Sequence, residues 1–98
     1  MEIGYANRSI EKVCTNASAA ARKHGQAMAD KIHQRIDEIQ AAESVEEMIQ
    51  FKIGRCHSLH QNRRNQYAVD LIHPYRLVFE KMESGIQAVN IIEIVDYH

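Results

Sequence analysis

Residues 67–71 (YAVDL) and 75–80 (YRLVFE) decide the fold, because each run alternates between side chains for a buried and for an exposed face of a sheet. Residues 72–74 (IHP) lie between them and predict a turn. Proline ends one strand and cannot donate a hydrogen bond into the next. The two runs therefore predict neighbouring strands that are joined by a short turn.

Two further strands are predicted outside this pair. Residues 88–95 (AVNIIEIV) are rich in β-branched side chains. Their near-continuous apolar character predicts a central strand that is covered on both faces. Residues 83–85 (ESG) predict the turn before that strand. Residues 2–6 (EIGYA) alternate over a short length and predict a first strand at the other end of the chain.

The chain between the first strand and the sheet has helical periodicity. Asn7 or Ser9 is the predicted cap of a short first helix, and residues 15–16 (TN) offer a second cap. From there to about residue 42, apolar side chains recur at spacings of three and four, which predicts a long helix. Gly25 costs roughly 1 kcal/mol relative to alanine and marks a possible break, although packing usually outweighs one glycine.

A capping-box pattern at residues 44–47 (SVEE) predicts one more helical turn before the sheet. The order of elements predicts an α+β fold, with two N-terminal helices packed on one face of a small, mostly antiparallel sheet. Residues 1–98 are expected to form a single domain with one modest hydrophobic core. The predicted core residues are Ile32, Ile36, Ile39, Val69, Leu77, Phe79, Ile92 and Ile94.

Composition predicts a soluble globular protein. Hydrophobic residues make up 45% of the chain and charged residues 26%, which is ordinary for a folded domain. No apolar run reaches the length of a membrane span and no export signal is visible, so we expect a cytoplasmic protein. Cys14 and Cys56 are too few and too far apart for a disulfide framework, which fits a reducing compartment.

Charge is distributed unevenly along the chain. The formal net charge of −1 is not typical of a nucleic-acid-binding protein. No acidic residue lies between Glu47 and Asp70, however, and this window is rich in basic residues and histidine. Local charge steers a polyanion to a cleft, although a solvated basic hairpin is the other interpretation of this window. The candidate contacts to a polyanion are Lys52, Arg55, His60, Arg63 and Arg64.

Histidines, an arginine and a terminal Asp-Tyr-His supply candidate catalytic groups. A zinc site is disfavoured because His57 and His60 lack the paired ligands that such sites commonly use, and no cofactor is expected. RNA can be cleaved without a metal, since its own 2′-hydroxyl attacks the adjacent phosphate once a base, an acid and a cation are supplied. Histidine suits either proton-transfer role, and arginine matches phosphate geometry. The candidate catalytic residues are His57, Arg76, Asp96, Tyr97 and His98.

The chain resembles the HigB (plasmid-maintenance killer) branch of the RelE/ParE toxin superfamily over nearly its whole length. The resemblance rests on residues 55–59 (RCHSL), 66–71 (QYAVDL), 73–80 (HPYRLVFE) and 93–98 (EIVDYH). It implies the toxin of a type II toxin–antitoxin module, which cuts messenger RNA on the ribosome without a metal. It also implies a helix-turn-helix, HigA-like antitoxin as partner, with operator DNA contacted only through that antitoxin and no membrane partner. The residues that match the catalytic positions of this branch are His57, Asp96, Tyr97 and His98, and Arg76 matches its strand arginine near the scissile phosphate.

Other interpretations of these residues stay open. Arg76 could pair with Glu80 or Glu93 across the sheet instead of binding phosphate, and residues 96–98 could be a frayed tail. The alternative function is a non-catalytic binder of the same fold, such as a ParE-like inhibitor of DNA gyrase or an inactive toxin bound to its antitoxin. The histidine and the terminal Asp-Tyr-His favour the nuclease, because the ParE-like branch generally lacks them.

Overall fold

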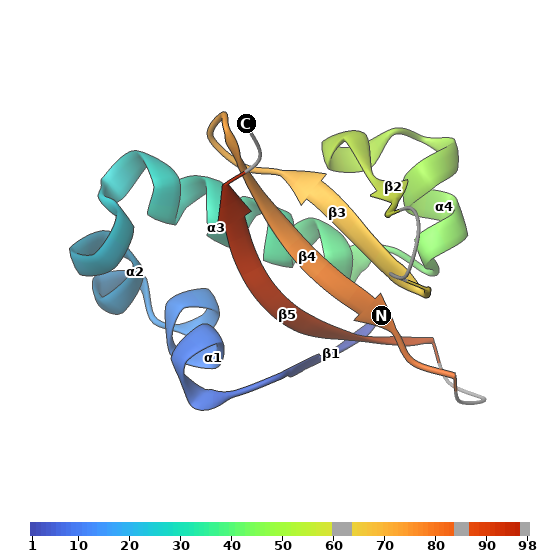
Figure 1. Cartoon of the computed structure of the whole chain (residues 1–98), viewed down its shortest axis with the longest axis horizontal. Helices are drawn as coiled ribbons and strands as arrows, with labels where there is room; N and C mark the ends of the chain where they lie inside the picture. Colours follow the sequence, from blue (N-terminus) through green and yellow to red (C-terminus); the bar gives the residue numbers. More distant parts are fainter. Residues whose placement is uncertain (60–63, 84–86, 97–98) are drawn as a thin grey trace.

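The computed structural model describes residues 1–59, 64–83 and 87–96. Helices occupy most of the first half of the chain, and strands dominate the second half (Figure 1). Within the described residues, no helix combines the length and the apolar character that crossing a bilayer requires. The elements in chain order are β1 (Glu2–Tyr5), α1 (Arg8–Thr15), α2 (Ala17–His24), α3 (Gln26–Ala41), α4 (Val45–Gln50), the 3₁₀ turn η1 (Ile53–Arg55), β2 (His57–Ser58), β3 (Gln66–Asp70), β4 (Tyr75–Lys81) and β5 (Ala88–Asp96).

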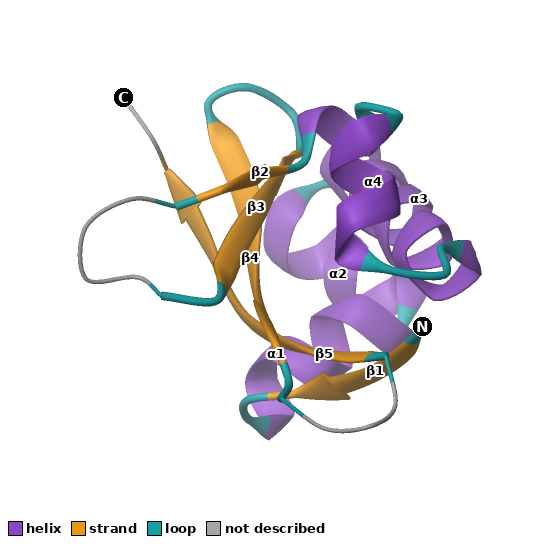
Figure 2. Cartoon of the chain, turned by 90° about the vertical axis from the view of Figure 1, so that its right-hand side faces the viewer, coloured by secondary structure: helices purple, strands orange, loops and turns teal. Residues whose placement is uncertain are grey.

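The described strands form one sheet in the order β1-β5-β4-β3-β2. The β1 strand runs parallel to β5, and the other neighbouring pairs are antiparallel. The helices gather on one side of this sheet, as the view in Figure 2 shows. The predicted α+β fold, with helices on one face of a mostly antiparallel sheet, is confirmed.

Side-chain caps start the helices at the predicted positions. The Asn7 side chain accepts a hydrogen bond of 2.9 Å from the Ile10 amide at the start of α1. The Asn16 side chain does the same for α2, at 3.0 Å from the Ala19 amide. The Ser44 hydroxyl accepts a 3.0 Å bond from the amide of residue 47 and starts α4. Each cap satisfies an amide that has no partner within its own helix.

The long helix predicted to about residue 42 is broken at Gly25. The chain adopts φ 85° and ψ 161° there, which ends α2 and lets α3 leave in a new direction. Only glycine adopts this backbone region without strain. Two helices were predicted before the α4 turn and three are present, because here the glycine is not overridden by packing.

The hydrophobic core lies between the helices and the sheet. Val45, Met48 and Ile91 are completely buried there, beside the predicted core residues. Six of the eight predicted residues are buried: Ile32, Ile36, Ile39, Val69, Leu77 and Phe79.

The core prediction is wrong for Ile92 on β5, whereas Ile94 is partly buried and packs against the core. Val78 pairs with Glu93, but the next residue of β4 pairs with Ile91, so the register skips one residue at Ile92. Such a β-bulge changes which side chains of the strand face the core. Ile91 is buried, whereas Ile92 and Ile94 are only partly buried. The β5 strand is central in the sheet, as predicted, but it is not covered on both faces.

Candidate active site

Strand β2 brings His57 alongside the sheet on the side away from the helices. His57 lies opposite Ala68, Ala68 opposite Val78, and Val78 opposite Glu93. Ala68 and Val78 alternate along their strands with core residues such as Val69 and Leu77. Because successive side chains of a strand point to opposite faces, they lie on the face of the sheet away from the helices. Arg76 lies two residues before Val78 and belongs to the same face. The sheet therefore places His57 and Arg76 on one surface.

A strained turn follows α4 and supplies two cations beside this surface. Lys52 and Arg55 each have φ 55°, and Gly54 between them has φ 58°. For a residue with a side chain, the left-handed region costs roughly 1–2 kcal/mol. Such outliers concentrate at functional sites, and Lys52 and Arg55 line the same groove as Arg76 of β4. Sequence reasoning missed the turn, for which Gly54 was the available signal.

Four of the predicted site residues line a single groove of about 410 Å³. Ile49 and the buried Cys56 form its apolar part. A smaller hollow of about 140 Å³ adjoins the groove, because Arg55 and Arg76 line both. The predicted site residues in the groove are Lys52, Arg55, His57 and Arg76.

A backbone carbonyl orients the imidazole of His57. The Nδ1 atom of His57 lies 2.9 Å from the carbonyl oxygen of Arg55. Because a carbonyl oxygen only accepts hydrogen bonds, Nδ1 carries the proton and donates it to this contact. The Nε2 atom of the neutral ring is then the one that can take up a proton. The same residue thus places a guanidinium in the groove and fixes the tautomer of its histidine.

Asp70 connects the two arginines of the groove. Its Oδ2 lies 3.1 Å from Nε of Arg55, and its Oδ1 lies 3.4 Å from Nε of Arg76. Arg76 therefore forms an ion pair with its cross-strand neighbour Asp70, an acid that the sequence analysis did not name as its partner. Within the described residues, Oδ1 of Asp70 is buried and accepts no hydrogen bond, so its contact with Arg76 is electrostatic.

Two of the remaining predicted residues, Arg64 and Asp96, lie outside the groove lining. Arg64 is exposed in the turn before β3 and is not among the groove residues. Asp96 ends β5 opposite Tyr75 and also lies outside the groove lining. The predicted residues that fall outside the described parts of the chain are His60, Arg63, Tyr97 and His98.

The groove thiol is not a ready nucleophile or metal ligand. Burial raises the pKa of Cys56 to about 11, so the thiol stays protonated at neutral pH. Among residues 1–59, 64–83 and 87–96, no three His, Cys, Asp or Glu side chains gather in a group that could hold a metal ion. The chemistry available from the described groove residues is proton transfer by His57 and charge stabilisation by Lys52, Arg55 and Arg76.

Comparison with known proteins relates the chain to one group of folds. No protein-family model matches the sequence, and no curated protein matches it. The structure is similar to a YoeB/ParE toxin from Agrobacterium tumefaciens, with a TM-score of 0.67 over 100% of both chains. The two sequences are 15% identical, a level at which the likeness concerns the fold. The chain thus has a RelE/ParE-like fold.

Proposed function

We propose that the chain is the toxin of a type II toxin–antitoxin module and cleaves translated messenger RNA on the ribosome without a metal. The observation that supports this function is the groove itself. His57, Arg55 and Arg76 line it together, although they come from three separate elements. A proton carrier beside cations that match phosphate is what cleavage of RNA by its own 2′-hydroxyl requires.

In the proposed reaction, the 2′-oxygen forms a bond to the adjacent phosphorus while the bond from phosphorus to the 5′-oxygen breaks. A base accepts the proton of the 2′-hydroxyl, and an acid gives a proton to the departing 5′-oxygen. The products are a 2′,3′-cyclic phosphate and a 5′-hydroxyl. His57 is one of the two proton carriers through Nε2, and Arg76 stabilises the charge that develops on the phosphoryl oxygens.

The finer assignment to the HigB branch belongs to the same proposal. Asp96, Tyr97 and His98 complete the catalytic set, and His60, Arg63 and Arg64 extend the contacts to RNA beyond Lys52 and Arg55. A HigA-like antitoxin neutralises the toxin in the cytoplasm and carries the contact with operator DNA. The supporting feature is the terminal Asp-Tyr-His, which the sequence shares with that branch.

A specific contact favours the non-catalytic alternative. Asp70 lies within ion-pair distance of both Arg55 and Arg76, and a carboxylate there competes with phosphate for the same cations. In a binder of the same fold, this arrangement would serve only to hold the surface together. Such a protein would act by occupying a target such as DNA gyrase or its antitoxin, and His57 would have no role.

Primer extension on a message in a translating extract distinguishes the two. The nuclease should produce cuts at codon-phased positions that disappear when initiation is blocked. The His57→Asn variant should make no cuts, while the matched control His24→Asn, which changes a histidine on α2 that does not line the groove, should cut normally. An uncut message together with inhibition of DNA supercoiling would instead identify a gyrase inhibitor.

A further inference from the structure

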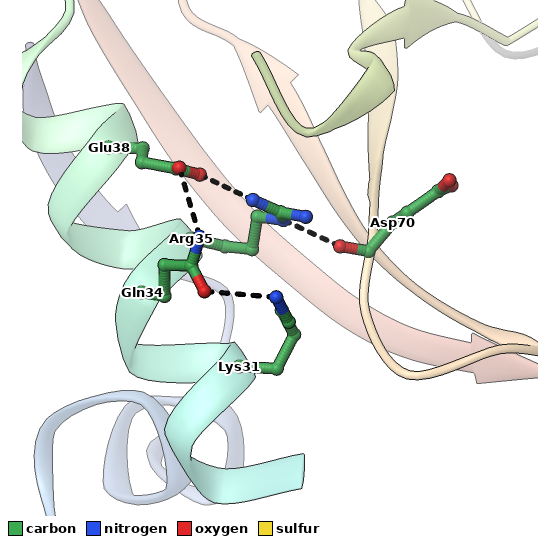
Figure 3. A network of polar contacts seen from close by, with 5 residues as sticks. All are labelled: Lys31, Gln34, Arg35, Glu38 and Asp70. Atoms are coloured by element: carbon green, nitrogen blue, oxygen red, sulfur yellow. Dashed lines mark hydrogen bonds and ion pairs between the residues drawn. The ribbon is translucent and has the colours of Figure 1, made fainter. Parts of the chain in front are cut away.

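A largely enclosed arginine on α3 lies beneath the groove without lining it. Arg35 donates from Nε to the backbone carbonyl oxygen of Asp70 at 2.6 Å and from Nη1 to Glu38 at 2.7 Å. Its side chain is only 13% exposed. Figure 3 shows the guanidinium between α3 and β3, while the carboxylate of Asp70 points away from it. Arg35 therefore binds the backbone of Asp70 and leaves the carboxylate to Arg55 and Arg76.

The same guanidinium also supports the strained turn. A Cβ atom on Gly54 would lie 3.0 Å from Nε of Arg35 and 3.2 Å from its Cζ. The turn therefore rests directly on Arg35, and only a residue without a side chain allows this approach. Gly54 immediately precedes Arg55, whose side chain enters the groove and whose carbonyl orients His57.

Arg35 thus contacts two backbone segments that carry residues of the Arg55–Asp70–Arg76 cluster. One contact is with Asp70 on β3, and the other is with Gly54 at the base of the Arg55 turn. The flat, forked guanidinium fixes the separation between these two segments better than a flexible point charge would. Glu38 offsets its positive charge, so Arg35 itself is not positioned to bind a phosphate.

We propose that Arg35 is a positioning residue, which sets the geometry of Arg55, Asp70 and Arg76 for phosphate binding. The inference rests on the proposed nuclease function for its kinetic consequence, but the positioning itself is a property of the fold. A misplacement of about 1 Å in a catalytic group can lower a rate by on the order of a hundredfold. Loss of Arg35 should therefore lower the maximal cleavage rate about ten- to a hundredfold, with little change in the toxin concentration that gives half of that rate.

A set of matched variants on programmed ribosomes tests the kinetic consequence. Arg35→Gln should lower the maximal single-turnover rate, and Arg35→Lys should not restore it, because lysine lacks the fork. Lys31→Gln is the control, since Lys31 lies one turn earlier on α3 and bonds only to Gln34 at 3.0 Å among the described residues. Gly54→Ala should reproduce the Arg35→Gln defect from the other side of the contact.

A double-variant comparison separates positioning from general stability. If Arg35 acts through Arg55, adding Arg35→Gln to Arg55→Ala should cost much less than it costs in the wild type. A purely structural role predicts instead that the two losses multiply and that both follow the fall in melting temperature. If Arg35→Gln and Gly54→Ala both cleave at the wild-type rate, at a temperature where both are folded, the inference is overturned.

A measurement that does not depend on cleavage tests the positioning role of Arg35 separately from the proposed nuclease function. The Nε–H resonances of Arg55 and Arg76 in the NMR spectrum report their surroundings directly. They should shift in Arg35→Gln and stay in place in Lys31→Gln. An uncut message with wild-type protein would reject the nuclease, whereas unchanged arginine resonances in Arg35→Gln would reject the positioning role, whatever the function.

Discussion

The helix side of the sheet and the groove beside β2 differ in what holds them together. Between the helices and the sheet, the buried side chains are all apolar within the described parts of the chain. Beside the groove, Asp70 forms ion pairs with Arg55 and Arg76, and the turn that carries Arg55 has a left-handed backbone. The first region is stabilised by burial, which tolerates some repacking, and the second depends on individual contacts.

This difference predicts how each region responds to substitution. A charge placed on the helix side should prevent folding, whereas loss of a charge in the groove should leave the fold intact and remove activity.

The largest effect is expected for Ile91→Asp. Ile91 is completely buried, so the substitution places an unpaired carboxylate in the core at a cost of several kcal/mol. The protein should fail to fold, as judged by circular dichroism and the soluble yield. Ile92→Asp is the matched control one residue along the same strand, and it should fold because Ile92 is partly exposed at the bulge. Equal damage from both would mean that the bulge does not set the faces of β5.

Removal of the Arg76 guanidinium should lower cleavage activity without unfolding the protein. Arg76→Ala should reduce cleavage on the order of a hundredfold or more, because it removes a cation from developing phosphate charge. Asp70 keeps its ion pair with Arg55 when Arg76 is removed, so the fold should be retained. Parallel measurements of cleavage rate and melting temperature check this, with exposed Arg22→Ala on α2 as the control. A destabilised but active Arg76→Ala protein would assign the residue a structural role.

A substitution of Gly25, where the helix breaks, should have an intermediate effect on stability. Gly25→Ala should lower the free energy of unfolding by roughly 1–2 kcal/mol, because alanine is strained at φ 85°. A methyl group at this position would meet no atom within 4 Å, so the cost is one of backbone conformation and not of a clash. Chemical denaturation measures the change, and cleavage activity should stay normal. A lost activity would show that the α2–α3 break communicates with the groove.

The smallest effect should come from an exposed ion pair. Lys81 donates to Glu46, and this hydrogen bond lowers the pKa of the Glu46 carboxyl. Stability gained from a lowered carboxyl pKa is present at neutral pH and is lost as the pH falls through the folded value. Glu46→Gln should therefore cost less than about 1 kcal/mol at pH 7, and nothing once the carboxyl is protonated in both states. A larger loss that persists at low pH would point to packing at this position.

Regular periodicity explains which parts of the fold were predictable. The alternation of residues 67–71 and 75–80 and the caps at Asn7, Asn16 and Ser44 are local signals, and the structure follows them. The break at Gly25 was named as possible but expected to be outweighed by packing, and the bulge at Ile92 was missed. At these two points a single backbone conformation overrides the pattern around it.

The site was predictable only in part, for a related reason. The residue types indicated that Lys52, Arg55, His57 and Arg76 were candidates, and these four do line one groove. Their arrangement depends on Asp70 and Arg35, which are distant in sequence and carry no motif of their own. Contacts between segments that are far apart along the chain leave no periodic trace in a single sequence.

The central claim is that the groove cleaves RNA through His57 and Arg76. Its most direct measurement maps the chemical ends of a message bound to programmed ribosomes, after a single turnover with the wild type and with His57→Asn. We predict 2′,3′-cyclic phosphate and 5′-hydroxyl ends with the wild type, without added metal, and intact message with the variant. Ends of the same kind and amount from the His57→Asn protein, or no cleavage by the wild type, would contradict the claim.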